Sequence, residues 1–158
     1  MEYEIVELEE MLIEGVGIRT TNQNGQAVKD IGTLWQKFFG QGIYTNIKNK
    51  KNDKTIGLYT DYEGDYTKPY QFITGTEVTS FSKEEPEDMV TKVIPKGIYA
   101  KFTITEEDKQ QAIGRLWETI WQMNLPRSYI CDFEEYATMD EQGNAKEINV
   151  YIGLRSIA

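Results

Sequence analysis

The chain has 158 residues, 39% of them hydrophobic, which suits one folded domain or two small halves that share a core. Its formal net charge of −9 argues against direct nucleic-acid binding, which depends on clustered lysine and arginine, and mildly favours a positively charged ligand. With one cysteine, no histidine, no apolar run of about 20 residues and no signal-peptide pattern, we expect no disulfide, metal, cofactor or membrane contact and a cytoplasmic location.

The first half of the chain predicts two strands, a helix and two more strands. Residues 3–8 and 11–20 are rich in β-forming residues and predict the first two strands. Apolar residues spaced three and four apart over 31–39 predict an amphipathic helix. Two further strands are expected at 55–62 and 70–78, with a turn-forming Glu-Gly-Asp between them.

The second half predicts the same order of elements. A polar segment with a proline, 80–88, is interpreted as the connection between the halves. A loop that contains glycine and asparagine is expected to join the last two strands as a hairpin. The predicted elements of this half are the strands 89–94 and 97–104, the helix 113–121, the strands 130–139 and 147–154, and the loop 140–144.

The two predicted helices carry the evidence for an internal duplication. Ile31-Gly-Thr-Leu-Trp35 is echoed by Ile113-Gly-Arg-Leu-Trp117, with identical isoleucine, glycine, leucine and tryptophan. We therefore predict one α+β domain spanning 1–158, built from tandem strand-strand-helix-strand-strand repeats at about 1–79 and 89–158. Their antiparallel sheets are expected to carry the helices on one face, with a central ligand cleft between halves that face each other across a pseudo-two-fold axis.

Short motifs along the second half resemble a known family. Four segments carry the resemblance, namely Ile94–Phe102, Leu116-Trp117, Phe133-Glu-Glu-Tyr136 and Val150–Leu154. In this order they look like the GyrI-like small-molecule-binding domain, which is also the effector-binding domain of AraC- and MerR-type transcription regulators such as Rob and BmrR. The segment Thr103-Ile-Thr105 differs from the His-Thr-Gly-like sequence that is frequent in the family.

The resemblance implies a duplicated fold whose central cleft binds lipophilic, often cationic compounds. It also implies that the glutamate of the Phe-Glu-x-Tyr strand is a buried acid, and here that residue is Glu134. A link to transcription regulation or to drug and toxin response follows from the same resemblance. The family's effector domains usually follow a helix-turn-helix segment, which this sequence lacks, so we do not expect direct DNA binding.

Six residues are predicted to bind the ligand. Glu134 and Tyr136 lie two apart on a predicted strand and should share one face of it. A carboxylate buried beside aromatic rings favours a cation, which the rings attract in turn. Trp35 is interpreted as a core residue of the first helix. The predicted ligand-binding residues are Glu134, Tyr136, Trp117, Trp121, Tyr59 and Tyr151.

The leading hypothesis is a stand-alone protein that binds a small organic, cationic molecule. One alternative is a protein-binding inhibitor of the DNA gyrase inhibitor type, with a protein partner for its acidic surface. The other is a hydrolase of reactive small molecules, in which Glu134 would be the general base for water. The sequence has no nucleophile–base pair and no metal-binding motif, so no catalytic residue is assigned and an enzyme is the less favoured interpretation.

Overall fold

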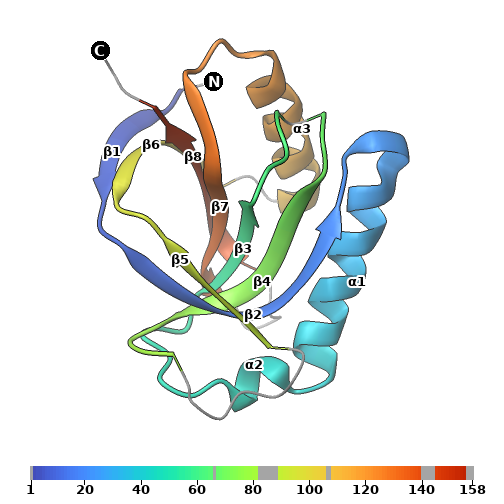
Figure 1. The fold of residues 1–158 in the computed structure, drawn as a ribbon, viewed down its shortest axis with the longest axis vertical. Helices are drawn as coiled ribbons and strands as arrows, with labels where there is room; N and C mark the ends of the chain where they lie inside the picture. The colour runs from blue at the N-terminus through green and yellow to red at the C-terminus, as the bar shows by residue number, and fades with distance from the viewer. Residues whose placement is uncertain (1, 66, 82–88, 106–107, 140–144, 156–158) are drawn as a thin grey trace.

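The strands and the two long helices follow the predicted order, whereas the short helices at 23–25 and 43–46 were not predicted. The computed structural model describes residues 2–65, 67–81, 89–105, 108–139 and 145–155, and it confirms the α+β class (Figure 1). No helix in these ranges is both long and apolar enough to cross a bilayer. The elements are β1 (Glu4–Leu8), β2 (Met11–Thr20), η1 (Gln23–Gly25), α1 (Gln26–Gly40), α2 (Ile43–Asn46), β3 (Thr55–Thr60), β4 (Tyr70–Val78), β5 (Val90–Ile94), β6 (Gly97–Ile104), α3 (Lys109–Gln122), β7 (Arg127–Met139) and β8 (Ala145–Leu154).

The two long helices form where their apolar stripes predict them. In α1 the stripe buries Leu34 and Phe38, and in α3 it buries Leu116 and Ile120. The start of α3 is capped by the side chain of Asp108, which accepts a hydrogen bond from a backbone N–H of the first turn. Each helix therefore presents one apolar face to the sheet.

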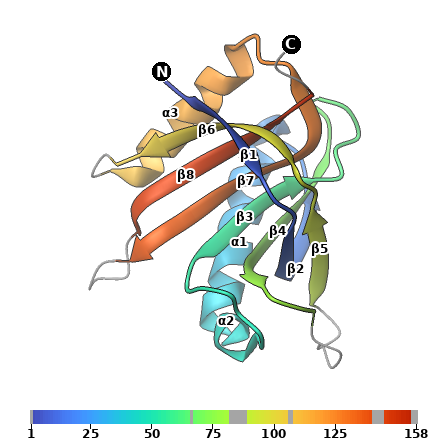
Figure 2. The same cartoon turned by 90° about the vertical axis from the view of Figure 1, so that its left-hand side faces the viewer.

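All strands pair antiparallel in one sheet with the order β1-β6-β8-β7-β3-β4-β2-β5. The halves are joined edge to edge, because β3 pairs with β7 from Thr55↔Tyr136 to Thr60↔Cys131. This differs from the expectation of two sheets that face each other. Both α1 and α3 lie against one face of the joined sheet (Figure 2), so the space between the helices lies over the β3–β7 junction.

The opening strands of the two halves are exchanged. β1 pairs with β6 of the second half, and β5 pairs with β2 of the first half. The strand order is consequently symmetric about the β3–β7 junction, as a tandem repeat would require. The duplication itself stays a prediction from the echoed helix sequence.

Two short connections make the sheet curl. Only Glu9 and Glu10 separate β1 from β2, and only Pro95 and Lys96 separate β5 from β6, although each pair of strands lies toward opposite edges of the sheet. The edges must therefore approach each other, and Figure 1 shows the resulting curved sheet. Its concave face holds a core that includes Phe133, while separate apolar clusters lie under α1 and α3 on the other face.

Several strand boundaries differ from their predicted positions, and at β3 and β7 the backbone shows why. β3 ends at Thr60 because Asp61 has a positive φ of 50°, which takes the chain out of the extended conformation. β7 begins earlier than predicted, at Arg127, and has an irregular stretch before Asp132 in which Tyr129 has a φ of 54°. The predicted loop 140–144 and residues 82–88 of the predicted connection lie outside the described residues.

Replacing Gly75 should destabilise the fold. Gly75 lies directly opposite Gly15 in the β2–β4 pair, and a Cβ on it would be 2.5 Å from a backbone oxygen of Glu14. The Gly75→Ala variant should lose about 1–3 kcal/mol of unfolding free energy, because a backbone contact cannot move aside as a side chain can. Urea denaturation followed by circular dichroism would measure this loss.

The matched control is Gly32→Ala in α1, where an added Cβ has nothing within 4 Å. Alanine at this exposed helical position should raise the unfolding free energy by up to about 1 kcal/mol. Equal effects from the two substitutions would contradict the close approach of β2 and β4.

Candidate functional site

A buried carboxylate lies at the junction of the two halves. Glu134 of β7 is only 3% exposed, yet its side chain accepts three hydrogen bonds. The hydroxyl of Tyr136 donates to Oε1 at 2.7 Å. The indole Nε1 of Trp117 and the hydroxyl of Tyr59 donate to Oε2 at 2.7 and 2.9 Å. The structure thus brings together four of the six residues predicted to bind the ligand, and they come from β3, α3 and β7.

The strand pattern of β7 explains how these groups meet. Glu134 and Tyr136 alternate with Phe133, which lies in the core of the concave face, so the acid and the phenol point toward the helices. Gly57 lies directly opposite Glu134 on β3. A Cβ on Gly57 would be 3.2 Å from Oε1 of Glu134 and equally close to the ring of Phe72. The glycine therefore leaves the room in which the carboxylate and the ring pack.

The aromatic rings that donate to this carboxylate pack against further aromatic rings. The ring of Tyr59 lies 5.0 Å from those of Trp117 and Phe72, and the ring of Trp35 meets Tyr136 edge-on at 5.2 Å. Phe72 is fully buried, whereas the other four rings are only half-buried. We call Trp35, Tyr59, Phe72, Trp117 and Tyr136 the aromatic cage of Glu134.

Trp35 and Phe72 belong to the cage but were not predicted there. Trp35 does pack on the apolar cluster under α1, as expected of a core residue, but its ring also reaches Tyr136. The echoed sequence held a signal for this position, since Trp35 and Trp117 occupy the same place in the two helices. Phe72 had no such signal, because its contact depends on the pairing of β3 with β4.

The remaining two predicted residues are not among the three donors to Glu134. Tyr151 pairs with Phe133 and stacks on its ring at 4.6 Å, which places it on the concave face of the sheet. It is therefore not part of the cage. Trp121 is half-buried and lies one turn after Trp117 in α3.

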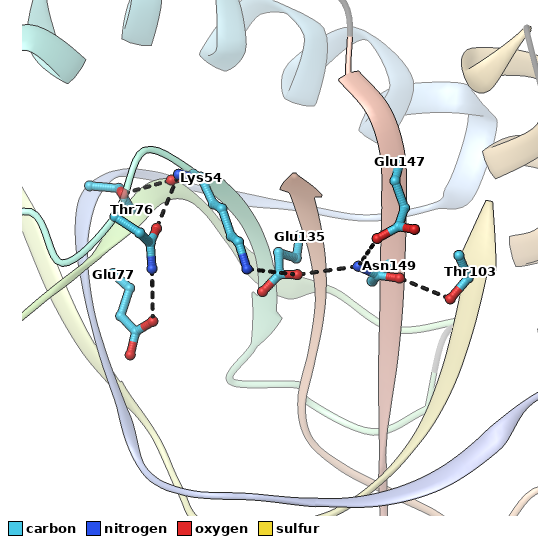
Figure 3. Close-up of polar contacts among 8 residues, drawn as sticks. Lys54, Thr76, Glu77, Thr103, Glu135, Glu147 and Asn149 are labelled. Atoms are coloured by element: carbon cyan, nitrogen blue, oxygen red, sulfur yellow. Dashed lines mark hydrogen bonds and ion pairs between the residues drawn. The ribbon is translucent and has the colours of Figure 1, made fainter. Parts of the chain in front are cut away.

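The neighbouring glutamate has a different environment. Glu135 points to the other face of the sheet, where its Oε1 lies 3.7 Å from Nζ of Lys54 and accepts a hydrogen bond from Asn149 (Figure 3). Asn149 also contacts Glu147 and Thr103 in the same network. Glu135 thus has a cationic partner, whereas no lysine or arginine of the described chain forms an ion pair with Glu134.

Burial is the largest influence on the pKa values of the carboxyl and phenol groups at the site. Burial raises the pKa of Glu134 above its ordinary value, and the three hydrogen bonds from Tyr136, Trp117 and Tyr59 oppose this effect. The pKa values of Tyr59 and Tyr136 are raised well above their ordinary values, first by burial and then by the charge of Glu134. Both phenols therefore remain hydrogen-bond donors across the physiological pH range.

This arrangement combines one buried carboxylate with neutral partners. Three neutral donors hold the carboxylate, and the aromatic rings that carry these donors lie beside it. Within the described ranges no group of three or more histidine, cysteine, aspartate or glutamate residues could hold a metal ion.

Comparison with known proteins assigns the chain to a family. Residues 4–154 match the family model Cass2, described as integron-associated effector binding protein. The chain belongs to this family. A search of curated proteins finds no significant match. Family membership and structural neighbours confirm the resemblance to GyrI-like domains, and they show that the protein is an effector-binding protein for a small molecule.

Three solved structures illustrate these similarities. The integron cassette protein VCH_CASS2 from the mobile metagenome of Vibrio cholerae is 29% identical, with a TM-score of 0.75 over 97% of this chain and 95% of that chain. SAV2435, solved bound to tetraphenylphosphonium, is 17% identical, with a TM-score of 0.74 over 99% and 96%. The C-terminal domain of EcmrR is 14% identical, with a TM-score of 0.59 over 99% and 100%. SAV2435 and the EcmrR domain share the fold of this chain.

Glu134→Gln should stabilise the protein without ligand. The pKa of Glu134 is higher in the folded chain than in the unfolded one, so the folded state binds more protons between these two values. Wild type therefore loses unfolding free energy as the pH rises through this window, whereas the glutamine variant does not lose this contribution. Each unit of the pKa difference corresponds to about 1.4 kcal/mol. Urea denaturation from pH 4 to pH 8 would measure the divergence.

The control for this experiment is Glu135→Gln, which removes the same charge from the other face of β7. It should not stabilise the protein, because the substitution removes the ion pair between Glu135 and Lys54. If Glu134→Gln were less stable than wild type at every pH, the net effect of burial on the carboxylate would have the opposite sign.

Proposed function

We propose that the protein binds a lipophilic organic cation against Glu134, with the rings of the aromatic cage around the positive charge. The observation that carries this proposal is a carboxylate that is 3% exposed, held by three neutral donors, and without an ion-pair partner in the described chain. The complex of SAV2435 with tetraphenylphosphonium supports it, because a protein of this fold accommodates such a cation.

The energetics favour a cation over a neutral ligand of the same shape. An ionised carboxylate without a counter-charge is unfavourable in a buried position, and a ligand cation relieves this cost by direct attraction. The faces of Trp35, Trp117 and the tyrosines add cation–π attraction of about 0.5–2 kcal/mol per well-placed ring. A neutral isostere gains only the burial of its apolar surface.

The cage can receive a ligand from solvent. Trp35, Tyr59, Trp117 and Tyr136 are half-buried, so each of these residues keeps some surface exposed to solvent. The three donors to Glu134 come from β3 of the first half and from α3 and β7 of the second. The position of Glu134 therefore depends on the spacing of these elements. We propose that this sensitivity serves a response to toxic lipophilic cations, linked to transcription regulation.

Tetraphenylphosphonium should bind and quench tryptophan fluorescence, because Trp35 and Trp117 both belong to the cage. Glu134→Gln should weaken binding at least about tenfold, as expected for the loss of an ion pair that is mostly removed from water. Glu135→Gln is the matched control and should change Kd less than about twofold. Fluorescence titration at pH 8 would compare the three proteins, and equal losses from both variants would reject Glu134 as the anion.

The affinity for tetraphenylphosphonium should also rise with pH. A proton competes with the cation for Glu134, and the pKa of this carboxyl is raised by burial in the free protein. Kd should therefore fall by up to tenfold per pH unit below that pKa and become constant above it. Calorimetric titration at several pH values would measure this change. An affinity that does not change between pH 4 and pH 8 would contradict the competition.

A further inference from the structure

A second buried charged group lies on the same face of the sheet as Glu134. Nη2 of Arg127 donates to Oδ2 of Asp132 at 2.7 Å, and their side chains are 5% and 0% exposed. The other carboxylate oxygen of Asp132 accepts the backbone N–H of Gly153 at 2.8 Å, and Tyr62 donates its hydroxyl to Oδ2. The hydrogen-bonding capacity of Asp132 is thus well used within the protein.

The hydrogen-bonding capacity of Arg127 is not fully used. Its Nε and Nη1 are buried and have no hydrogen-bond partner among the described residues. Burial lowers the pKa of Arg127, but the negative charge of Asp132 and the hydrogen bond to it outweigh this effect, so the pKa is raised and the guanidinium stays charged. Buried donors of a charged group are unfavourable when they are unpaired, and such groups in native proteins almost always meet an acceptor.

The position of this group relates it directly to the cage. Asp132 lies two residues before Glu134 on β7, which corresponds to about 7 Å along one face of the strand. It also lies directly opposite Tyr59 of β3, the residue that donates to Glu134. The cage and the Arg127–Asp132 pair are therefore neighbours with Tyr59 between them.

A continuous row of aromatic rings connects the two places. The ring of Tyr59 lies 5.6 Å from that of Tyr70, which lies 5.7 Å from that of Tyr62. Tyr62 meets Tyr129 edge-on at 5.6 Å, and the guanidinium of Arg127 lies 4.3 Å from the ring centre of Tyr129. Tyr62 and Tyr129 are half-buried, as are most rings of the cage.

Helix α3 extends along this row of rings, from the cage toward the Arg127–Asp132 pair. It leads into β7 through a short connection, and the two elements run in opposite directions (Figure 1). Trp121 lies one turn, or about 6 Å, beyond Trp117, and this distance is similar to the spacing of Asp132 from Glu134 on β7. From these spacings we infer that Trp121 lies toward the second charged group, whereas Trp117 contacts Glu134 directly.

We propose that Arg127 is a second anchor of the ligand site, which donates a hydrogen bond to a neutral carbonyl oxygen on the same molecule whose cation contacts Glu134. A neutral acceptor fits because the carboxylate of Asp132 already balances the guanidinium charge and would repel an anionic group. The inference rests on the proposed function, since it takes the cation at Glu134 as given. The ligand class is then a lipophilic cation that carries an ester, amide or ketone.

The experiment compares two phosphonium probes of similar length. One is (3-ethoxycarbonylpropyl)triphenylphosphonium, which has an ester carbonyl, and the other is heptyltriphenylphosphonium, which has only a hydrocarbon arm. Without a contact to Arg127 the heptyl probe should bind more tightly, because its arm is more apolar. With the contact, wild type should prefer the ester probe by about tenfold, as expected for a hydrogen bond to a charged donor. Fluorescence titration measures both affinities.

A double variant separates Arg127 from the rest of the site. Arg127→Met combined with Asp132→Asn removes both buried charges together and keeps an acceptor for the N–H of Gly153. This variant should lose the ester preference and still bind the heptyl probe within about threefold of wild type. Circular dichroism establishes its folding, and if it does not fold, the wild-type preference decides the question alone.

The outcomes distinguish the two proposals. A wild type that binds the heptyl probe at least as tightly as the ester probe overturns the second anchor and leaves the cation site standing. A folded double variant that keeps the ester preference also overturns the second anchor. If wild type binds neither probe, the proposed function itself fails, and the second anchor fails with it.

Discussion

The burial of Glu134 with three neutral hydrogen-bond donors is the constraint on which the site depends. Each donor comes from a different place: Tyr59 from β3, Trp117 from α3 and Tyr136 from β7 itself. The carboxylate can have this environment only if the two halves are joined edge to edge and α3 lies over the junction. The same constraint explains Gly57, since a side chain opposite Glu134 would occupy the space of the carboxylate and of Phe72.

The two halves contribute unequally to a site that their symmetry makes possible. Both helices bring a tryptophan to the junction from the same position of the echoed sequence, so Trp35 and Trp117 border it on two sides. Only the second half supplies an acid here, since the residue directly opposite Glu134 on the first half's strand β3 is Gly57. A symmetric scaffold with one charge gives a bound molecule a direction, and the Arg127–Asp132 pair lies on one side of that charge only.

Much of the fold could be predicted from the sequence, because strand and helix periodicities are local properties. The echoed helices and the shared face of Glu134 and Tyr136 were predicted on this basis, while the burial of the acid was implied by family resemblance. Contacts set by strand register could not be predicted. Tyr151 illustrates this limit, since its face follows from its pairing with Phe133. The exchange of β1 and β5 and the Arg127–Asp132 contact likewise depend on how distant segments meet.

The exchanged edge strands have a consequence for folding. Because β1 completes the sheet of the second half and β5 completes that of the first, neither half contains all the strands that cover its own edge. Each half alone would expose unpaired backbone groups and part of the concave core. We therefore expect the halves to be interlocked and to unfold in one cooperative transition, with no stable half-folded intermediate. For a site divided between two halves of the chain, such interlocking keeps the donors to Glu134 at a constant spacing whenever the protein is folded.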